Sequence, residues 1–365
     1  MNTRPALPLT PAAGCNCAVC PFYRGNPDAS QPVCSGCSAS CEYCACSRAA
    51  DQRAAEQRSG CSQCPVRCGS RTDIAAWMTD VGPLTFDDLH VPGVRPSGLP
   101  SLIPQVDSTA IGALDAALGW PAYALGLRRI LSPETQKIYA RWEGADARTM
   151  LGLSAEQQAI LVGHADDDMV EGLWTRRRVD HLAEVIADQS WDLVIGPDFS
   201  IYGNQPRSEH LIAMRRSLMV AAELAAAGAS VAPTLHWFRH EDLQRYLDWL
   251  IDHYPAGPAA VACNLQTLRT DRAWHDLALP GLALIAATLP PDLPVMLCGT
   301  SRASRIAELV ALFGARTHVI AQSPLHYARH GTVMTAAGRH PVDWHVPDLF
   351  AANVTYYHTL LEGTG

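Results

Sequence analysis

The sequence predicts an α/β protein in which a (βα)8 TIM-like barrel follows a cysteine-rich, metal-binding module. Short apolar runs alternate with helical patterns along most of the 365 residues, as expected for a parallel sheet covered by helices. The region after residue 100 has about the length of a (βα)8 barrel. Eleven of the thirteen cysteines lie between Cys15 and Cys68, in a segment too poor in aliphatic residues to form an apolar core.

The predicted barrel strands are short apolar runs, each bounded by a turn or a helical pattern. Seven runs qualify, namely 102–106, 123–130, 192–197, 230–237, 259–266, 294–300 and 318–323. An eighth run, 342–345, is weaker. Because this last strand is weak and no glycine-rich dinucleotide motif follows any run, an open doubly wound sheet is the alternative fold.

Helices are expected between these runs, and several carry recognisable start or stop residues. Leucines at helical spacing and terminal glycines or histidines predict helices over 206–228, 240–253, 301–314 and 347–362. Ser154-Ala-Glu-Gln157 fits a capping box, which begins a helix. Residues 131–191 are too long for one crossover between strands, so they are predicted to be a helical insertion.

In this interpretation the chain divides into a cysteine module (1–75), a linker (76–100) and the barrel (101–365). The linker is assigned because prolines and glycines near its end interrupt any regular element. The formal net charge of −8 argues against a protein that coats nucleic acid. No segment has the ~18–20 apolar residues that a membrane helix needs, and no signal peptide is recognised. The sequence therefore predicts a cytoplasmic protein with no membrane partner.

The clustered cysteines are predicted to bind metal, because cytoplasmic thiols stay reduced and disulfides are rare there. Pairs separated by two residues suit zinc, and two triplets that place three thiolates within eight residues suit an iron–sulfur cluster. Iron–sulfur is favoured over zinc. The predicted ligands are Cys15, Cys17, Cys20, Cys34, Cys37, Cys41, Cys44, Cys46, Cys61, Cys64 and Cys68.

One triplet, Cys37-Ser-Ala-Ser-Cys41-Glu-Tyr-Cys44, resembles the cluster motif of radical SAM enzymes, including the aromatic residue before the last cysteine. The resemblance implies a cubane cluster held by these three cysteines, with one iron open to bind S-adenosylmethionine. It covers eight residues, so it applies to this motif alone.

A second resemblance covers roughly residues 190–315. The stretch Ile195-Gly-Pro-Asp198-Phe-Ser200-Ile-Tyr202-Gly-Asn-Gln-Pro206, followed by a helix and Val231-Ala-Pro-Thr-Leu-His-Trp237, resembles an uncharacterised domain-of-unknown-function family common in phages and mobile elements. This implies the fold unit and the importance of the Asp198 loop. It implies no established reaction.

Polar side chains follow the predicted strands at their carboxyl ends, where a barrel carries its chemistry. Asp198 is the predicted catalytic carboxylate, a base or nucleophile, with His236 or His240 as its acid–base partner. Main-chain N–H groups opening the helix near 301 would hold a phosphate or carboxylate. The predicted substrate-binding residues are Arg129, Ser200, Tyr202, Asn204, Asn264, Thr300, Ser301, Arg302 and Gln322, with Arg129 or Arg302 as anion clamp. Simple capping of loops and helices by Asp198, Thr300 or Ser301 is the alternative.

These patterns together predict a metal-cluster-containing barrel enzyme of transferase or lyase type. Its substrate would be a small molecule, nucleotide or nucleic acid that bears a phosphate or a nucleobase, and base modification is the class that fits best. Two alternatives stay open. One is radical SAM chemistry through the first triplet, and the other is a zinc-stabilised binding protein of a mobile element without enzymatic activity.

Overall fold

The computed structural model describes residues 27–28, 74–107, 111–115, 118–203 and 207–363, so the eleven clustered cysteines lie outside it. Eight parallel strands form one sheet in the order β5-β4-β3-β2-β1-β8-β7-β6. They are β1 (Leu102–Val106), β2 (Ala122–Gly126), β3 (Gln158–Val162), β4 (Leu193–Ile195), β5 (Val231–Ala232), β6 (Val261–Asn264), β7 (Val295–Cys298) and β8 (Thr317–Ala321). Strand β1 is in register with both neighbours, opposite Ala124 of β2 at Gln105 and opposite Ile320 of β8 at Ile103.

The ring closes between β5 and β6. Just beyond β5, Thr234 forms a parallel bridge with Ala262 of β6. Here the Leu235 N–H donates to the carbonyl of Ala262 at 2.7 Å, and the Ala262 N–H donates to the carbonyl of Pro233 at 3.0 Å. The prediction of a (βα)8 TIM-like barrel is therefore confirmed over the open doubly wound sheet.

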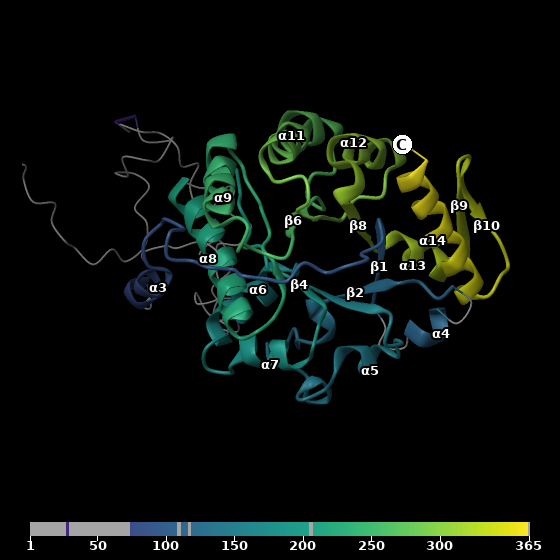
Figure 1. Cartoon of the computed structure of the whole chain (residues 1–365), viewed down its shortest axis with the longest axis horizontal. Coiled ribbons are helices and arrows are strands. Elements are labelled where there is room, and N and C mark those ends of the chain that lie inside the picture. The colour runs from purple at the N-terminus through teal and green to yellow at the C-terminus, as the bar shows by residue number, and fades with distance from the viewer. Residues whose placement is uncertain (1–26, 29–73, 108–110, 116–117, 204–206, 364–365) are drawn as a thin grey trace, which may run out of the picture.

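Helices surround the sheet, and the β9–β10 hairpin lies at its outer edge beside α13 and α14 (Figure 1). The helices are α3 (Ile74–Val81), α4 (Ile111–Asp115), α5 (Ala147–Leu151), α6 (Asp167–Arg176), α7 (Leu182–Asp188), α8 (Arg207–Ala226), α9 (His240–His253), α10 (Asp271–Ala273), α11 (Leu279–Thr288), α12 (Ala303–Phe313), α13 (Ser323–Arg329) and α14 (Val346–Glu362). Short turns of other helix types are η4 (Leu127–Arg129), η5 (Ala140–Trp142), η6 (Trp274–Ala278) and η7 (Gly314–Arg316), and the hairpin pairs β9 (Thr332–Thr335) with β10 (Gly338–Pro341). None of these described helices has the length and apolar character that crossing a membrane requires.

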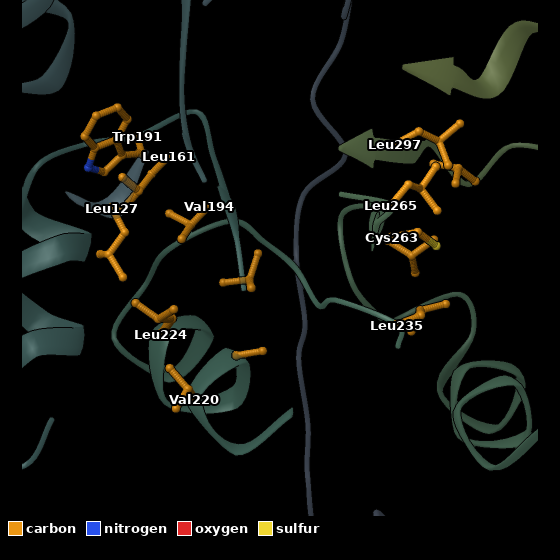
Figure 2. Close-up of a cluster of buried hydrophobic side chains, with 14 of the residues drawn as sticks. Leu127, Leu161, Trp191, Val194, Val220, Leu224, Leu235, Cys263, Leu265 and Leu297 are labelled. Carbon is orange, nitrogen blue, oxygen red and sulfur yellow. The ribbon is translucent and has the colours of Figure 1, made fainter. Parts of the chain in front are cut away.

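Side chains alternate between the inside and the outside of the barrel, as the period of two in a strand requires. Inward residues form one buried cluster of mostly small or branched side chains, including Ala124, Ile160 and Met296. Outward residues form a second, larger cluster with the helices. Figure 2 shows part of it, with Val194 of β4 near Val220 and Leu224 of α8. The strands are buried on both faces, which explains why they appear in the sequence as continuous apolar runs.

The predicted helices are largely confirmed. Helix α9 begins and ends at the expected residues, and α8, α12 and α14 begin and end within two residues of theirs. The terminal glycines are Gly228, with φ of +103°, and Gly314, with φ of +56°. Positive φ is sterically inexpensive for glycine, which accounts for its place at these helix ends.

The prediction of a helical insertion over 131–191 is wrong, because this stretch contains β3. The Ser154 N–H donates to Gln157 Oε1 at 2.9 Å, as in a capping box, but the turn leads into the strand. Four successive buried residues, Ala159 to Val162, then pair with β2 and β4. Tertiary burial of an apolar run prevails over a local helix-start signal, and β3 replaces 342–345, which is not a strand.

The predicted linker is packed against the barrel. Val81, Phe86, Leu89 and Val91 are buried, and Trp249 Nε1 of α9 donates to the carbonyl of Leu89 at 2.9 Å. The chain then crosses the amino ends of the strands. There its carbonyls accept hydrogen bonds from residues at or next to the starts of strands. Gln158 donates to the carbonyl of Ser97 at 2.7 Å, and Ser230 donates to that of Val94 at 3.0 Å. His318, the second residue of β8, donates to the carbonyl of Pro100 at 2.9 Å. This segment covers one end of the barrel, and the carboxyl ends of the strands lie at the other.

Candidate functional site

A cavity of about 880 Å³ lies at the carboxyl ends of the strands. Loops after β1, β2, β3, β4, β6 and β8 contribute its lining, which includes Gln105, Asp107, Arg128, Arg129, His164, Asp166, Asp167, Asp168, Asp198, Ser200, Tyr202, Asn264, Gln266, Gln322, His326, Arg329 and His330. Six of the predicted site residues therefore meet in one place: Arg129, Asp198, Ser200, Tyr202, Asn264 and Gln322. We call this space the acidic cavity, because five aspartates and three arginines line it.

Asp198 follows β4 and is held by an amide from across the barrel. Asn264 Nδ2 donates to Asp198 Oδ2 at 2.8 Å. The Gln266 N–H donates to Oδ1 of the same amide at 3.1 Å. Because both ends of the Asn264 amide are engaged, it fixes one carboxylate oxygen of Asp198 and leaves the other for different partners.

The Asp198 loop is supported from behind by a buried ion pair. The Phe199 N–H donates to Ser217 Oγ of α8 at 3.1 Å, and the Phe199 ring lies 3.8 Å from the Arg216 guanidinium carbon. Arg216 in turn donates two hydrogen bonds to Glu171 of α6, at 2.8 and 2.6 Å. Helices α6 and α8 thus set the position of the loop through Phe199.

Ser200 and Tyr202 are tied to the start of α6. Ser200 Oγ donates to Asp167 Oδ1 at 2.5 Å, and the Tyr202 hydroxyl donates to the other oxygen of the same carboxylate. A carboxylate in the first turn of a helix is favoured by the helix dipole. Both hydroxyls line the acidic cavity with their protons already engaged, so they would offer a ligand their oxygen lone pairs.

The arginines of the acidic cavity are paired with its aspartates. Arg129, a predicted anion clamp, lies 3.2 Å from Asp107. Asp107 also forms an ion pair with Arg329. Arg128 lies 3.2 Å from Asp166. These contacts neutralise much of the positive charge, which makes the cavity a poor place for a phosphate and a better one for hydrogen-bond donors.

His164 is a cavity residue that sequence reasoning missed. It follows β3 and is 9% exposed. Its Nε2 lies 2.8 Å from Thr234 Oγ1, whose hydroxyl donates to the carbonyl of Gly196 at 2.7 Å. Burial lowers the pKa of His164, and the Asp198 carboxylate opposes that effect. The run Ala159–Val162 before a glycine, a histidine and three aspartates was the available signal, and the helical interpretation of that stretch concealed it.

The two predicted acid–base histidines line neither cavity. His236 packs beside the Tyr246 ring, with 6.0 Å between ring centroids, and its Nδ1 lies 3.4 Å from the carbonyl of Thr234. Burial lowers the pKa of His236, and Asp198 opposes it. His240 is exposed at the start of α9. Asn204 lies outside the described residues.

A second cavity of about 400 Å³ adjoins the first and holds the predicted anion-binding segment. It lies among the loops after β6, β7 and β8. The lining residues are Leu265, Gln266, Arg269, Gly299, Thr300, Ser301, Arg302, Arg305, Ala321, Gln322 and Ser323, of which three are arginines and none is acidic. We call it the basic cavity. Gln266 and Gln322 line both spaces, so the two cavities are adjacent.

Two arginines of the basic cavity, Arg305 and Arg302, differ in how far their side chains are exposed. The Arg305 side chain is 8% exposed and donates to the carbonyls of Leu268 and Arg269, at 2.8 and 3.0 Å, so it holds the loop after β6. Arg302 is 58% exposed and pairs with Asp271 at 2.7 Å. Helix α12 begins directly after Arg302 without a side-chain cap from the described residues, which leaves its first N–H groups for an acceptor.

Gly299 allows the loops after β6 and β7 to approach each other. Its φ is +85°, and a Cβ atom there would lie 2.0 Å from Gln266 Cγ and 2.9 Å from the Gln266 nitrogen. A side chain at this position would therefore displace Gln266, which lines both cavities.

The eleven cysteines predicted to bind metal lie outside the described residues. Within the ranges that the structure describes, no three His, Cys, Asp or Glu side chains converge on a metal site. Cys263 and Cys298 are buried thiols. Burial raises the pKa of Cys263 to about 12, which keeps this thiol protonated and unreactive.

No protein-family model matches the sequence, and no curated protein matches it significantly. Both family resemblances described above therefore remain predictions. The chain has the fold of a (βα)8 barrel, a fold that supports many unrelated reactions, so function has to be inferred from the site.

Proposed function

We propose that this protein is a barrel enzyme acting on a small molecule that carries a phosphate group at one end and a polar head, such as a nucleobase, at the other. One observation carries the proposal. Two adjacent cavities at the carboxyl ends of the strands have opposite charge, and two glutamines, Gln266 and Gln322, line both. A ligand that spans both cavities would have an anionic end and an end rich in hydrogen-bond donors.

The phosphate is assigned to the basic cavity. In (βα)8 enzymes the loops after the seventh and eighth strands, with a helix N-terminus, commonly hold a phosphate. Here the loop after β7 brings Thr300, Ser301 and Arg302 to the uncapped start of α12, and the loop after β8 adds Gln322 and Ser323 to the lining. Main-chain N–H groups and a guanidinium are strong donors to phosphate oxygens. The lining itself contains no carboxylate. Asp271, which lies outside that lining, pairs with Arg302 at 2.7 Å, so a phosphate would compete with Asp271 for this half-exposed guanidinium.

The polar head is assigned to the acidic cavity. Amide side chains there can both donate and accept hydrogen bonds, as the edge of a nucleobase requires. These are Gln105, Asn264, Gln266 and Gln322. Asp198 is the proposed base or nucleophile, because Asn264 holds it within this cavity and one of its oxygens is left to face a ligand. The acidic cavity alone, at about 880 Å³, is within the usual range of ligand pockets.

Metal in the N-terminal cysteine module belongs to this proposal as well, as iron–sulfur or, alternatively, zinc. It is supported by the cysteine spacing alone. Elemental analysis for iron, sulfide and zinc on anaerobically purified protein tests it, and protein free of all three would contradict it. Reductive cleavage of S-adenosylmethionine by iron-loaded protein would support radical chemistry through Cys37, Cys41 and Cys44.

Calorimetric titration with a matched ligand panel tests the cavity assignment. The panel pairs each nucleoside 5′-monophosphate with its nucleoside and with inorganic phosphate. We expect at least one monophosphate to bind about tenfold or more tightly than its nucleoside, since an extra charge-assisted contact contributes roughly 1.5–3 kcal/mol. Equal affinity within every pair, or no binding by any monophosphate, would contradict the proposal.

A further inference from the structure

We infer that His164, with its tautomer fixed by Thr234, is the residue that accepts and returns a proton in the acidic cavity, and that Asp198 stabilises its protonated form. The inference rests on the proposed function, because it assigns a chemical role within the same site. It also replaces His236 and His240 as the acid–base histidine, and it gives Asp198 the role of stabilising the charge in place of the role of base. His164 is the histidine that both lines the cavity and lies near Asp198.

A hydrogen-bond chain determines which nitrogen of His164 carries the proton. The carbonyl of Gly196 can only accept, so the Thr234 hydroxyl, 2.7 Å away, donates its proton there. The Thr234 oxygen is then an acceptor for His164, and Nε2, 2.8 Å away, must carry the hydrogen. Nδ1 of the neutral ring therefore holds the lone pair. The chain joins residues that follow β3, β4 and β5, which makes the ring orientation a property of the barrel.

The second nitrogen is left without a partner. His164 Nδ1 is buried and has no hydrogen-bond partner among the described residues, while the side chain lines the acidic cavity and is 9% exposed. Buried polar atoms in proteins are nearly always hydrogen-bonded, so an acceptor without a partner, on a residue that lines a cavity, would gain from a ligand donor. A substrate O–H or N–H would supply it.

The surrounding charges suit a reversible proton acceptor. Burial keeps the His164 imidazole neutral at pH 7, and Asp198 after β4 favours the charged form. The other titratable neighbours are His236 after β5 and Asp166, Asp167 and Asp168 in the loop that carries His164. In the proposed step Nδ1 takes a proton from the substrate, whose O–H or N–H bond breaks and leaves its electron pair on the substrate. The imidazolium then returns that proton to the product.

Nitrogen-detected NMR of protein labelled with ¹⁵N-histidine tests the inference without a known substrate. His164→Gln assigns the resonances of His164, and His164→Asn serves if that variant does not fold. We expect a neutral ring with Nε2–H at pH 7. Thr234→Val should shift the population toward Nδ1–H, and Thr234→Ser, which keeps the hydroxyl, should not. An Nδ1–H tautomer in the wild-type protein would overturn the inference.

A second titration tests the partnership with Asp198. Asp198→Asn should lower the pKa of His164 further, because it removes a nearby opposite charge. An unchanged His164 pKa in this variant would overturn the role of Asp198. The calorimetric panel separates this result from the proposed function. Failure of every monophosphate to bind wild-type protein would contradict the proposed function alone, whereas the two NMR experiments use ligand-free protein and test His164 directly.

Discussion

The buried ion pair between Glu171 and Arg216 is predicted to control both stability and the Asp198 loop. The two side chains are 2% and 3% exposed and share two hydrogen bonds of 2.8 and 2.6 Å. Replacing either residue by methionine leaves the other charge buried without its opposite charge, which costs about 3–5 kcal/mol. If the two effects were independent, the double variant would lose about 6–10 kcal/mol.

We predict a much smaller loss for the double variant Glu171→Met/Arg216→Met, because no buried charge remains. What it loses is mainly the stacking of Arg216 over Phe199 and Trp174, at 3.8 and 4.6 Å from the ring centroids, worth about 1–3 kcal/mol in total. Urea unfolding of the wild-type protein, the two single variants and the double variant gives the coupling energy, which we expect to be at least about 3 kcal/mol.

The exposed pair Arg272–Asp276 provides a matched control, since its side chains are 91% and 67% exposed. Removing it should change stability by less than about 0.5 kcal/mol. The reasoning would be refuted if the stability losses of the two single variants simply add in the double variant. It would also be refuted if each single variant loses no more stability than the control. Either result would also remove the proposed support of the Asp198 loop by α6 and α8.

Three further predictions concern the cavities and the buried histidines. Arg302→Ala should weaken binding of a nucleoside monophosphate about tenfold or more in calorimetry. Arg272 is exposed and lines neither cavity, so Arg272→Ala should leave this affinity unchanged. Equal effects of the two substitutions would contradict the phosphate assignment. Gly299→Ala should lower the unfolding free energy by about 1–3 kcal/mol in urea titrations, and by more than Gly119→Ala, which also has positive φ but no atom within 4 Å of a new Cβ. Burial lowers the pKa of His164 and of His318 below the ordinary 6.5, so the unfolded chain binds more protons than the folded one. The unfolding free energy should therefore fall on the order of 1 kcal/mol per pH unit per histidine as the pH drops below 6.5. Substituting either histidine by glutamine should flatten this slope, and an unchanged slope would contradict the prediction.

Much of the barrel could be predicted from sequence because its strands are buried on both faces. Runs such as 294–300 and 318–323 contain strands with no exposed residue, so the apolar signal was continuous. Strand β3 was missed because a capping-box pattern directly precedes it, and its partners β2 and β4 lie far from that turn in sequence. Local patterns report helix starts, but they do not report which run a sheet will bury.

The candidate site was predictable to the extent that topology determines it. Carboxyl ends of parallel strands meet at one end of a barrel, so the order of strands along the chain is enough to group Asp198, Asn264 and Gln322. Pairing across the barrel could not be read from sequence. Arg129 was expected to hold an anion, but it is paired with Asp107, which also receives Arg329 more than two hundred residues later. Such long-range ion pairs depend on the closed ring.

The central claim is that one ligand spans the basic and the acidic cavity. The most direct measurement is a crystal structure of the full chain with its tightest-binding nucleoside monophosphate. We predict that the phosphate will lie within hydrogen-bond distance of Arg302 and the first N–H groups of α12, with the base beside Asp198 and His164. A phosphate seated among the aspartates of the acidic cavity, or a ligand bound away from the carboxyl ends of the strands, would contradict this claim.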